Sequence, residues 1–313
     1  MTLEHWASYY RGGAIVSCPT TADPNYTLEV RDAWASFFSA LPDRARILDL
    51  GTGNGPVALI AKETAEDLSR VFIIDAVDLA VIDPPQHVPD GQSLFKGIHF
   101  HSGVSTEALP FDKSTMDAVS GQYILEYTDV TKTLAEIGRV LVPGGRCQFI
   151  LHHCDSLVVK NAAESLRHAD LALRDKQVVR KFRRYCEADT PRKAETAKNK
   201  LFAVGAELQA TATNSENPLF LQYLIDSVNR LLQHRQQLGP GEMLRQTDRL
   251  ERELKYWVLR LKDLVAGARS SNDMEAIVKL AFDLRFRYIN YVQQLQDEDN
   301  LVGWRLNMTK TPA

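Results

Sequence analysis

One short stretch, residues 47–55, constrains the fold of this chain more than any other. Its sequence is Ile-Leu-Asp-Leu-Gly-Thr-Gly-Asn-Gly, and a proline and an apolar helical pattern follow it. An apolar run that passes through a tight turn into a helix is typical of a buried parallel strand and its crossover. Glycines at 51, 53 and 55 let the backbone adopt positive φ angles and approach a ligand closely. In an open α/β sheet this turn lies at the carboxyl end of a strand, where ligands bind.

The acid of this stretch, Asp49, narrows the class of ligand. A dinucleotide fingerprint spaces its glycines G-x-G-x-x-G and leaves the helix N-terminus for a pyrophosphate. Here the spacing is G-x-G-x-G, and Asp49 lies two residues ahead of the first glycine. A carboxylate beside the turn attracts a cationic ligand and repels a phosphate. We therefore expect a ligand that carries positive charge.

Composition and cysteine usage bound the class of protein. The chain has 313 residues, 44% of them hydrophobic, and its formal net charge of −3 does not suggest a nucleic-acid binder. No apolar run approaches the roughly 20 residues that span a bilayer, and the first residues lack the pattern of a secretory signal. We expect a cytoplasmic protein with no membrane partner. The cysteines show no C-x-x-C spacing, which fits a reduced compartment: Cys18, Cys147, Cys154 and Cys186.

Further strands and helices follow the glycine turn. Their apolar patterns are those of buried parallel strands joined by amphipathic helices. The predicted strands span 70–79, 98–101, 116–127 and 147–151, and predicted helices span 28–41, 56–69 and 128–141. The run Val-Pro-Gly-Gly at 142–145 predicts a helix stop ahead of the strand at 147–151.

The last part of the chain changes character. Residues 156–285 are mostly helical in pattern, and Asn272 with Glu275 resembles a capping box that opens one of these helices. Residues 286–294 and 302–308 flank a polar turn and predict an antiparallel hairpin.

Taken together, these motifs resemble the class I S-adenosylmethionine-dependent methyltransferases, whose first motif is D-x-G-x-G-x-G. Ala-Val-Asp-Leu-Ala at 76–80 is similar to the second motif of the family, and Glu-Ala-Leu-Pro-Phe at 107–111 is similar to the third. The resemblance is close over about residues 41–152. It implies an α/β fold with a doubly wound, mostly parallel, seven-stranded Rossmann-like sheet, in which the hairpin forms the terminal pair of strands.

Placed on that fold, the chain divides into three parts. Residues 1–40 would form an N-terminal helical lid, 41–155 with 286–313 the Rossmann-like methyltransferase core, and 156–285 a large helical insertion between strands five and six. N-terminal segments often close the site in this family, and residues 5–10 are rich in aromatic side chains. The alternative is that these rings only pack against the sheet.

The resemblance implies S-adenosylmethionine as the cofactor, with S-adenosylhomocysteine as its product. An acid that ends the second strand would accept both ribose hydroxyls; the motif favours Asp78, with Asp75 as the alternative. The acid that contacts the adenine amino group in the family is replaced by Ser105, so Ser105, Thr106 or a backbone carbonyl would take its place. The expected cofactor-binding residues are Asp49, Gly51, Thr52, Gly53, Asn54, Gly55, Asp78, Leu79, Ser105, Thr106, Gln122, Tyr123 and Tyr10.

Methyl transfer from a sulfonium is a direct displacement with a neutral leaving group, so alignment matters more than acid catalysis. An oxygen or nitrogen acceptor gains from a base that titrates near neutrality, which suits histidine. His152 and His153, at the carboxyl end of the fifth strand, are the first candidates. Tyr9 or Tyr10 come next, and then Glu126. No metal is expected at this site.

We expect a small-molecule methyltransferase that prefers oxygen or nitrogen to carbon as the acceptor atom. Two alternatives stay open. One is an RNA or protein methyltransferase, because 157–200 holds twelve Lys and Arg against six Asp and Glu. The other is a non-catalytic cofactor-binding protein of the same fold, because of the departure at Ser105. Apolar residues spaced by three and four along one predicted helix form a stripe, here called the leucine seam: Leu250, Leu254, Trp257, Leu261 and Leu264. This seam would pack on a neighbouring helix or join two subunits of a homodimer through the insertion.

Overall fold

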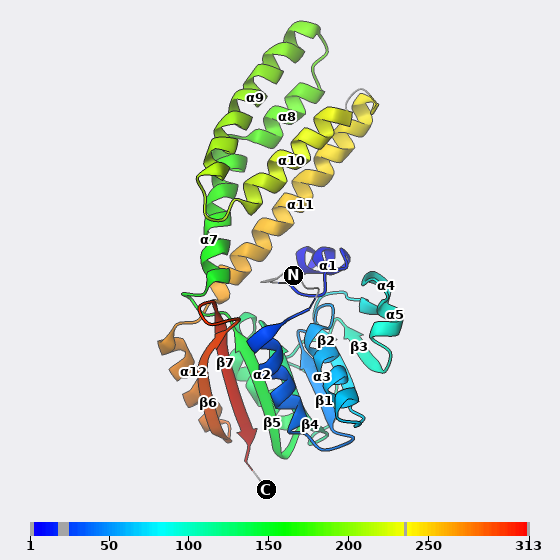
Figure 1. The fold of residues 1–313 in the computed structure, drawn as a ribbon, viewed down its shortest axis with the longest axis vertical. Coiled ribbons are helices and arrows are strands. Elements are labelled where there is room, and N and C mark those ends of the chain that lie inside the picture. The colour runs from blue at the N-terminus through cyan, green and yellow to red at the C-terminus, as the bar shows by residue number, and fades with distance from the viewer. Residues whose placement is uncertain (1–2, 18–24, 235–236, 312–313) are drawn as a thin grey trace. The chain divides into compact units, whose positions relative to one another are not determined.

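The computed structural model describes residues 3–17, 25–234 and 237–311 and divides the chain into two compact units. The first unit comprises Met1–Val159 and Ala266–Ala313, and the second comprises Lys160–Val265 (Figure 1). Each unit has a hydrophobic core of its own. Cys18 lies outside the described residues, and Cys147, Cys154 and Cys186 form no disulfide within the part of the chain that the structure describes.

The first unit is built on a seven-stranded sheet with the order β3-β2-β1-β4-β5-β7-β6. The strands from β3 to β5 pair in parallel, whereas β7 is antiparallel to both β5 and β6. The sheet is therefore mixed, and the predicted hairpin forms its antiparallel edge. The strands span Arg46–Leu50 (β1), Ile73–Asp78 (β2), Ile98–Ser102 (β3), Met116–Gln122 (β4), Leu141–Leu151 (β5), Phe286–Leu295 (β6) and Leu301–Lys310 (β7).

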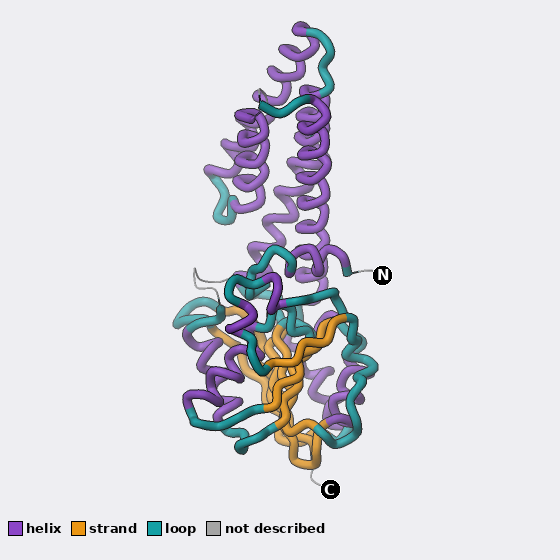
Figure 2. The backbone as a smooth tube through the Cα atoms, turned by 90° about the vertical axis from the view of Figure 1, so that its right-hand side faces the viewer, coloured by secondary structure: helices purple, strands orange, loops and turns teal. Residues whose placement is uncertain are grey.

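Helices cover both faces of this sheet, because the central strands bury side chains on both sides (Figure 2). On one face Ile47 and Ala118 pack with α2 and α3, and on the other Leu48 and Val119 pack with α6 and α12. This is a Rossmann-like α/β fold, as predicted. The helices of the unit are Glu4–Tyr10 (α1), Leu28–Ser39 (α2), Pro56–Asp67 (α3), Pro84–His87 (α4), Gly91–Leu94 (α5), Leu125–Tyr127 (η1), Val130–Val140 (α6) and Ser271–Asp283 (α12).

The order of the strands creates one crevice that matters for function. Chain order reverses at β1, which lies between β2 and β4. The carboxyl ends of β1 and β4 therefore meet where the crossovers diverge to opposite faces, and α/β sheets bind their ligands at such a point. The glycine turn follows β1 at this position.

The compact units do not coincide with the three parts expected from the sequence. Trp34 and Phe38 of α2 are wholly buried and belong to the core of the first unit, together with Ile47 of β1. At the other end, α12 also belongs to the first unit, because Met274 packs with Phe286 of β6. The second unit is thus shorter than the span 156–285.

Two local predictions were wrong in their details. The strand β5 begins at Leu141, not at 147: Met116 pairs with Leu141 and Ala118 with Arg146, so residues 142–145 bulge out between successive rungs. Gly144, with φ +80°, allows the bend without ending the strand. The capping box of α12 is formed by Ser270 and Asp273, not by the predicted Asn272 and Glu275, because the helix begins at Ser271.

The second unit is a helical bundle with a core of large apolar side chains, among them Phe182 and Phe220. Leu250 and Leu254 of the leucine seam lie in this core, and the Trp257 ring packs 5.2 Å from the Phe220 ring, centroid to centroid. These seam residues therefore pack within the unit. The helices here are Leu157–Ala169 (α7), the π-helix Asp170–Asp175 (η2), Val178–Cys186 (α8), Pro191–Thr213 (α9), Leu219–His234 (α10) and Pro240–Gly267 (α11), the first and last of which cross the unit's boundaries.

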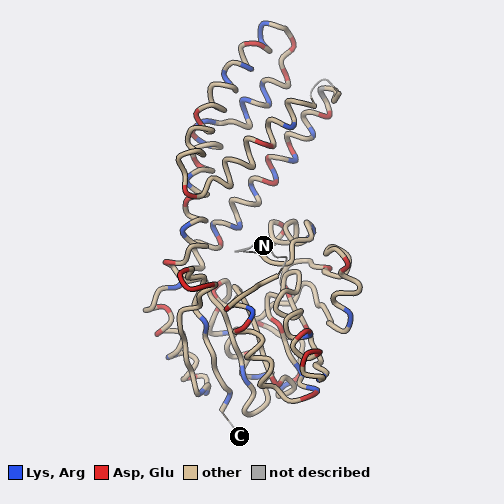
Figure 3. Tube along the Cα trace, viewed as in Figure 1, with Lys and Arg blue, Asp and Glu red and all other residues tan. Residues whose placement is uncertain are grey.

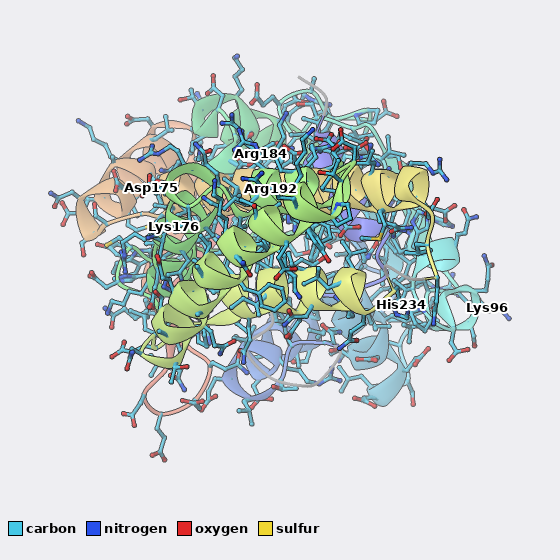
Figure 4. All side chains as sticks on the ribbon, turned by 90° about the horizontal axis from the view of Figure 1, so that it is seen from above. Lys96, Asp175, Lys176, Arg184, Arg192 and His234 are labelled. Atoms are coloured by element: carbon cyan, nitrogen blue, oxygen red, sulfur yellow. The ribbon has the colours of Figure 1, made fainter. Side chains whose placement is uncertain are left out.

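Lys and Arg residues are concentrated in α8 and at the start of α9, where the trace is blue in Figure 3. A groove of about 530 Å³ between these helices is lined by cationic side chains that include Arg184 and Arg192, both labelled in Figure 4. Other cations of the stretch pair with acids, as Arg183 does with Asp248 and Glu251. Within the described part of the chain, every helix is too short or too polar to cross a membrane.

The two cores predict which substitutions destabilise which unit. Phe182→Ala and Phe286→Ala each remove a wholly buried ring, so each should lower the free energy of unfolding by about 3–5 kcal/mol. Phe202→Ala is the matched control, because this ring is 54% exposed and its loss should cost about 0.5 kcal/mol or less. Urea denaturation followed by circular dichroism measures all three, and equal losses for Phe202→Ala and Phe182→Ala would contradict the assignment of the core.

Candidate functional site

The glycine turn takes the backbone through left-handed conformations that side chains rarely adopt. Gly51, Gly53 and Gly55 have φ angles of +58°, +52° and +81°. A Cβ atom on Gly51 would lie 2.4 Å from the Ile124 side chain, and one on Gly53 would lie 2.6 Å from the Tyr10 ring. Glycine is therefore required at 51 and 53 both by the backbone and by what packs against it.

Asp49 lies at the end of β1, just ahead of this turn, and only 1% of its surface is exposed. The Ser120 hydroxyl, on the neighbouring strand β4, donates a hydrogen bond of 2.7 Å to Asp49 Oδ1. Burial raises the pKa of Asp49 to about 6, and the hydrogen bond from Ser120 offsets part of that effect. At neutral pH the group is therefore a buried anion at the ligand edge of the sheet.

The two acids of β2 occupy different environments. Asp78 ends the strand and accepts hydrogen bonds from the N–H of Gly53 (2.9 Å) and of Ala80 (2.8 Å). Burial raises its pKa to about 6. Asp75 lies mid-strand and contacts His101 Nε2 at 2.9 Å. Of the two acids, Asp78 is the one that touches the glycine turn, and each of its oxygens keeps a lone pair for a further donor.

The N-terminal segment covers the glycine turn. The Asn54 side chain donates hydrogen bonds to the carbonyl oxygens of Tyr10 (2.9 Å) and Ala14 (2.8 Å), so its amide group holds this segment in place. A small cavity of about 20 Å³ lies between the segment and the turn. It is lined by Tyr10, Ile15, Ser17, Tyr26, Asp49, Gly51, Thr52, Gly53, Pro56, Val57 and Gln122.

Two residues at the exit of β4 close this side of the site. Gln122 accepts a hydrogen bond of 2.6 Å from the Trp34 indole, and its own Nε2 is buried with no partner among the described residues. Tyr123 has a positive φ of +55° and stacks on the His152 ring at 3.9 Å between centroids. Buried polar atoms without partners are rare in folded proteins and indicate a ligand or water that satisfies them.

Glu126 and His152 form a second buried pair at this edge. Glu126 Oε1 accepts the His152 backbone N–H at 2.7 Å, whereas Oε2 and both ring nitrogens of His152 have no partner in the described part of the chain. Arg269 donates to the backbone oxygen of Glu126. Burial raises the pKa of Glu126 to about 7 and lowers the pKa of His152 to about 3.

The remaining predicted residues are placed less directly. His153 stacks on Trp304 at 4.2 Å, and its Nδ1 accepts the Asp155 N–H. Thr106 is buried, and its hydroxyl is 3.2 Å from that of Thr133 on α6. Ser105 Oγ accepts the N–H of Glu107. Leu79 is half exposed, and the Tyr9 hydroxyl donates to the backbone oxygen of Val16.

Sequence reasoning missed three residues that hold the site together. Ser120 of β4 lies opposite Asp49 of β1 in the strand register. It is two residues before Gln122 and so shares a face of the sheet with it, and strand alternation could have identified it. Trp34 belongs to a helical apolar stripe, which gave no sign of its bond to Gln122. Arg269 is 143 residues from Glu126 along the chain, and no local pattern links them.

Comparison with known proteins now adds to this geometry. Residues 48–149 match the family described as "Methyltransferase domain". This segment is a class I S-adenosylmethionine-dependent methyltransferase domain. The match covers β1 to β5, including the glycine turn and the Asp78 loop.

Curated relatives of the methyltransferase domain match a similar part of the chain. A demethylmenaquinone methyltransferase of Deinococcus radiodurans is 34% identical over 105 residues, which cover 32% of this chain and 40% of the relative. The ubiquinone/menaquinone biosynthesis C-methyltransferase UbiE of Desulfotalea psychrophila is 32% identical over 115 residues, 34% of this chain and 41% of the relative. The chain thus spans about two fifths of the length of these relatives.

Solved structures of methyltransferases are similar at lower identity. The match to the citrinin polyketide synthase CMeT domain covers 90% of this chain and 51% of the chain of that structure, with 10% identity and a TM-score of 0.45. A second match is to a geranyl diphosphate C-methyltransferase from Streptomyces coelicolor A3(2) in complex with S-adenosyl-L-homocysteine. It covers 48% of this chain and 64% of the chain of that structure, with 18% identity and a TM-score of 0.36.

The cofactor of a methyltransferase domain of this class is S-adenosylmethionine, and the residues at the turn fit it. The buried carboxylate of Asp49 would attract the positive charge of a sulfonium bound at the turn. Asp78 accepts hydrogen bonds from two backbone N–H groups, and its remaining lone pairs can accept hydrogen bonds from ribose hydroxyls as well. The partnerless Gln122 Nε2 supplies a donor at the same edge.

The contrast between the acids of β2 gives a test of this assignment. Asp78→Asn should weaken binding of S-adenosylhomocysteine about tenfold or more, because hydrogen bonds to a charged group contribute about 1.5–3 kcal/mol. Asp75→Asn is the matched control: this side chain contacts His101 away from the turn, so the dissociation constant should change less than about threefold. Isothermal titration calorimetry measures both. A larger loss for Asp75→Asn would show that the ribose lies at the other acid.

Proposed function

We propose that this protein transfers the methyl group of S-adenosylmethionine to a small-molecule acceptor by direct displacement at the sulfonium. The observation that carries the proposal is the environment of the Glu126 carboxyl group. Its carboxyl group is buried, one oxygen is fixed by the His152 N–H, and the other has no partner among the described residues. A buried acid of this kind, with a pKa of about 7, is a functional-site candidate on physical grounds.

The position of Glu126 relative to the cofactor turn supports this role. Glu126 lies in η1, and the residue just before η1, Ile124, packs its side chain against Gly51. The short helix is therefore pressed against the same glycine turn that would hold the cofactor. The ring pair of Tyr123 and His152 lies next to it. A polar group of an acceptor that reaches Glu126 would thus enter beside the cofactor.

Displacement at a sulfonium releases a neutral thioether, so the protein has to align three atoms and exclude water. Alignment alone can supply a large share of the rate, since well-oriented reactions show effective molarities of about 10⁵ M or more. The acceptor must also lose a proton to become a good nucleophile. A carboxylate near neutrality can take that proton as general base.

The proposed base differs from the first choice made from the sequence. Histidine was favoured because its ordinary pKa is near 6.5, but burial lowers the pKa of His152 to about 3, which makes it a weak base. Burial acts in the opposite direction on a carboxyl group and raises the pKa of Glu126 to about 7. Glu126 therefore takes the role of base in our proposal, and His152 is a neutral ring that orients the acceptor.

Which atom of the acceptor receives the methyl group depends on which group of the acceptor loses a proton to Glu126. From the sequence we expected oxygen or nitrogen, whereas the name of one curated relative specifies a C-methyltransferase. Those matches cover only the cofactor-binding domain, so they leave the acceptor open. We propose an acceptor with an ionisable hydroxyl or amine, in which the methyl group goes to that atom or to a carbon that its loss of a proton activates.

A second candidate, methylation of RNA, is favoured by one observation, the basic groove between α8 and α9. Among the described residues, Arg184 and Arg192 of this groove have no ion-pair partner. Phosphate contacts of this kind make binding strongly dependent on salt. We favour the small-molecule acceptor because the formal net charge of the chain, −3, does not suggest a nucleic-acid binder.

Glu126→Gln tests the proposed chemistry directly. With methyl-labelled S-adenosylmethionine and a panel of small phenols, amines and reduced demethylmenaquinone, turnover should fall about 10²–10⁴-fold while S-adenosylhomocysteine binding persists. The wild-type kcat should rise with pH through about 7, because the base must lose its proton, and the glutamine variant should lack this rise. Glu66→Gln, an exposed carboxylate on α3, is the control. Undiminished turnover of Glu126→Gln would rule out this base.

The connection between the units generates a further prediction. The chain leaves the first unit after Val159 and returns at Ala266. Within the first unit, a few residues before and after these points, His153 and Arg269 form an isolated bridge. Both ends of the second unit therefore start from neighbouring points. Replacing residues 160–265 by a short glycine–serine linker should leave a cooperatively melting protein whose affinity for S-adenosylhomocysteine changes less than about threefold. A folded product without affinity would show that the second unit contributes to the cofactor site.

A further inference from the structure

A turn just after β5 brings three metal-binding side chains together. His153, Cys154 and Asp155 are consecutive, and each offers one donor atom. His153 Nδ1 lies 3.9 Å from Cys154 Sγ, Cys154 Sγ lies 3.6 Å from Asp155 Oδ2, and His153 Nδ1 lies 4.0 Å from the same carboxylate oxygen. Among the described residues, no other group of this kind meets the same spacing.

The size of this triangle matches one face of a tetrahedral metal site. Zinc binds thiolate sulfur at about 2.3 Å and imidazole nitrogen or carboxylate oxygen at about 2.0–2.2 Å, so its ligand atoms lie about 3.4–3.6 Å apart. The separation of 3.6 Å between Cys154 Sγ and Asp155 Oδ2 already equals such an edge, and the two separations from His153 Nδ1, 3.9 and 4.0 Å, are longer than it. Cys154 and Asp155 are exposed, and small rotations of their side chains would close the difference.

We propose that this turn binds a divalent metal ion of the zinc class through His153 Nδ1, Cys154 Sγ and Asp155 Oδ2. One nitrogen, one sulfur and one oxygen donor suit zinc or cobalt, whereas magnesium and calcium prefer oxygen alone. The exposed side of the turn leaves the fourth position to water. The thiolate is the ligand form of cysteine, so binding releases the proton of the Cys154 thiol to solvent.

The protein holds the first ligand in place before any metal arrives. The His153 ring is buried and stacks on Trp304 at 4.2 Å, with the rings 26° from parallel. Its Nδ1 accepts the Asp155 N–H at 2.9 Å, so this nitrogen presents its lone pair to the turn. A metal ion would displace that N–H, and because Asp155 is exposed, water can take its place.

The backbone around the turn is fixed from both sides. The Cys154 N–H donates to the backbone oxygen of Arg269 at 3.1 Å, and the Ser156 N–H donates to the backbone oxygen of His153 at 3.0 Å. These bonds limit the entropy that ligand binding would otherwise remove. From the sequence no metal is expected at His152 and His153; the site proposed here uses His153 with the two residues that follow it, and His152 is not one of its ligands.

Cobalt(II) is the probe for this site, because a thiolate ligand gives it a charge-transfer absorption in the near ultraviolet. The full-length protein, freed of metal by a chelator, should show this band on titration with Co²⁺ and lose it when Zn²⁺ is added. Cys154→Ser should abolish the band. Asp155→Asn should weaken Co²⁺ binding by about tenfold or more, since loss of even an outer-shell partner costs that much.

Cys186→Ser is the matched control, a partly exposed cysteine on α8, and it should leave the titration unchanged. His153→Gln removes the third ligand and should also weaken binding; a thermal melt shows whether that variant folds, and Cys154→Ser and Asp155→Asn test the site without it. The proposal is overturned if the wild type gives no band, if the band survives in Cys154→Ser, or if Cys186→Ser loses it equally. No methyl acceptor enters this measurement, so it stands apart from the proposed activity.

Discussion

The backbone of residues 51–55 is the constraint on which the rest of the first unit depends. Gly51 and Gly53 turn the chain through left-handed conformations, and their missing side chains leave space that other elements fill. Ile124 occupies the space beside Gly51, and the Tyr10 ring occupies the space beside Gly53. The exit of β4 and the N-terminal segment therefore converge on one point. Tyr10, Gly51 and Gln122 line the cavity at this point, and Ile124 directly precedes the short helix η1, which holds Glu126.

The site also concentrates buried negative charge. Burial raises the pKa of Asp49 and Asp78 to about 6 and that of Glu126 to about 7. A carboxyl group whose pKa is higher in the folded chain stabilises the fold below its unfolded value of about 4. That contribution is lost as the pH rises through the folded value. At neutral pH the charged forms of Asp49 and Asp78 therefore lower the free energy of unfolding, as expected where a site is built for binding rather than for stability.

Hydrogen bonds decide what each buried acid can do. Asp78 gives both of its oxygens to backbone N–H groups, which fixes its position beside the turn. Asp49 is held by the Ser120 hydroxyl. Glu126 is different, since its second oxygen is buried and has no partner among the described residues. The first two acids are suited to hold a ligand, and the third is suited to exchange a proton with one.

The sequence by itself determined the elements that depend on local periodicity and on glycine. The strand, turn and helix around Gly51, the parallel strands after it and the antiparallel hairpin at the end of the chain were all predicted. So was the methyltransferase class, because its motif is a continuous run of residues whose chemistry does not depend on distant partners.

Only the tertiary structure decided what surrounds each polar side chain. It showed that Asn54 holds the N-terminal segment, that the bulge at 142–145 lies within β5, and that Arg269 reaches Glu126 across 143 residues. It also moved our proposed base from His152 to Glu126, two candidates for the same role, since burial lowers the pKa of an imidazole and raises that of a carboxyl group. Burial and hydrogen bonding arise from residues far apart in the chain, and a sequence pattern records only its near neighbours.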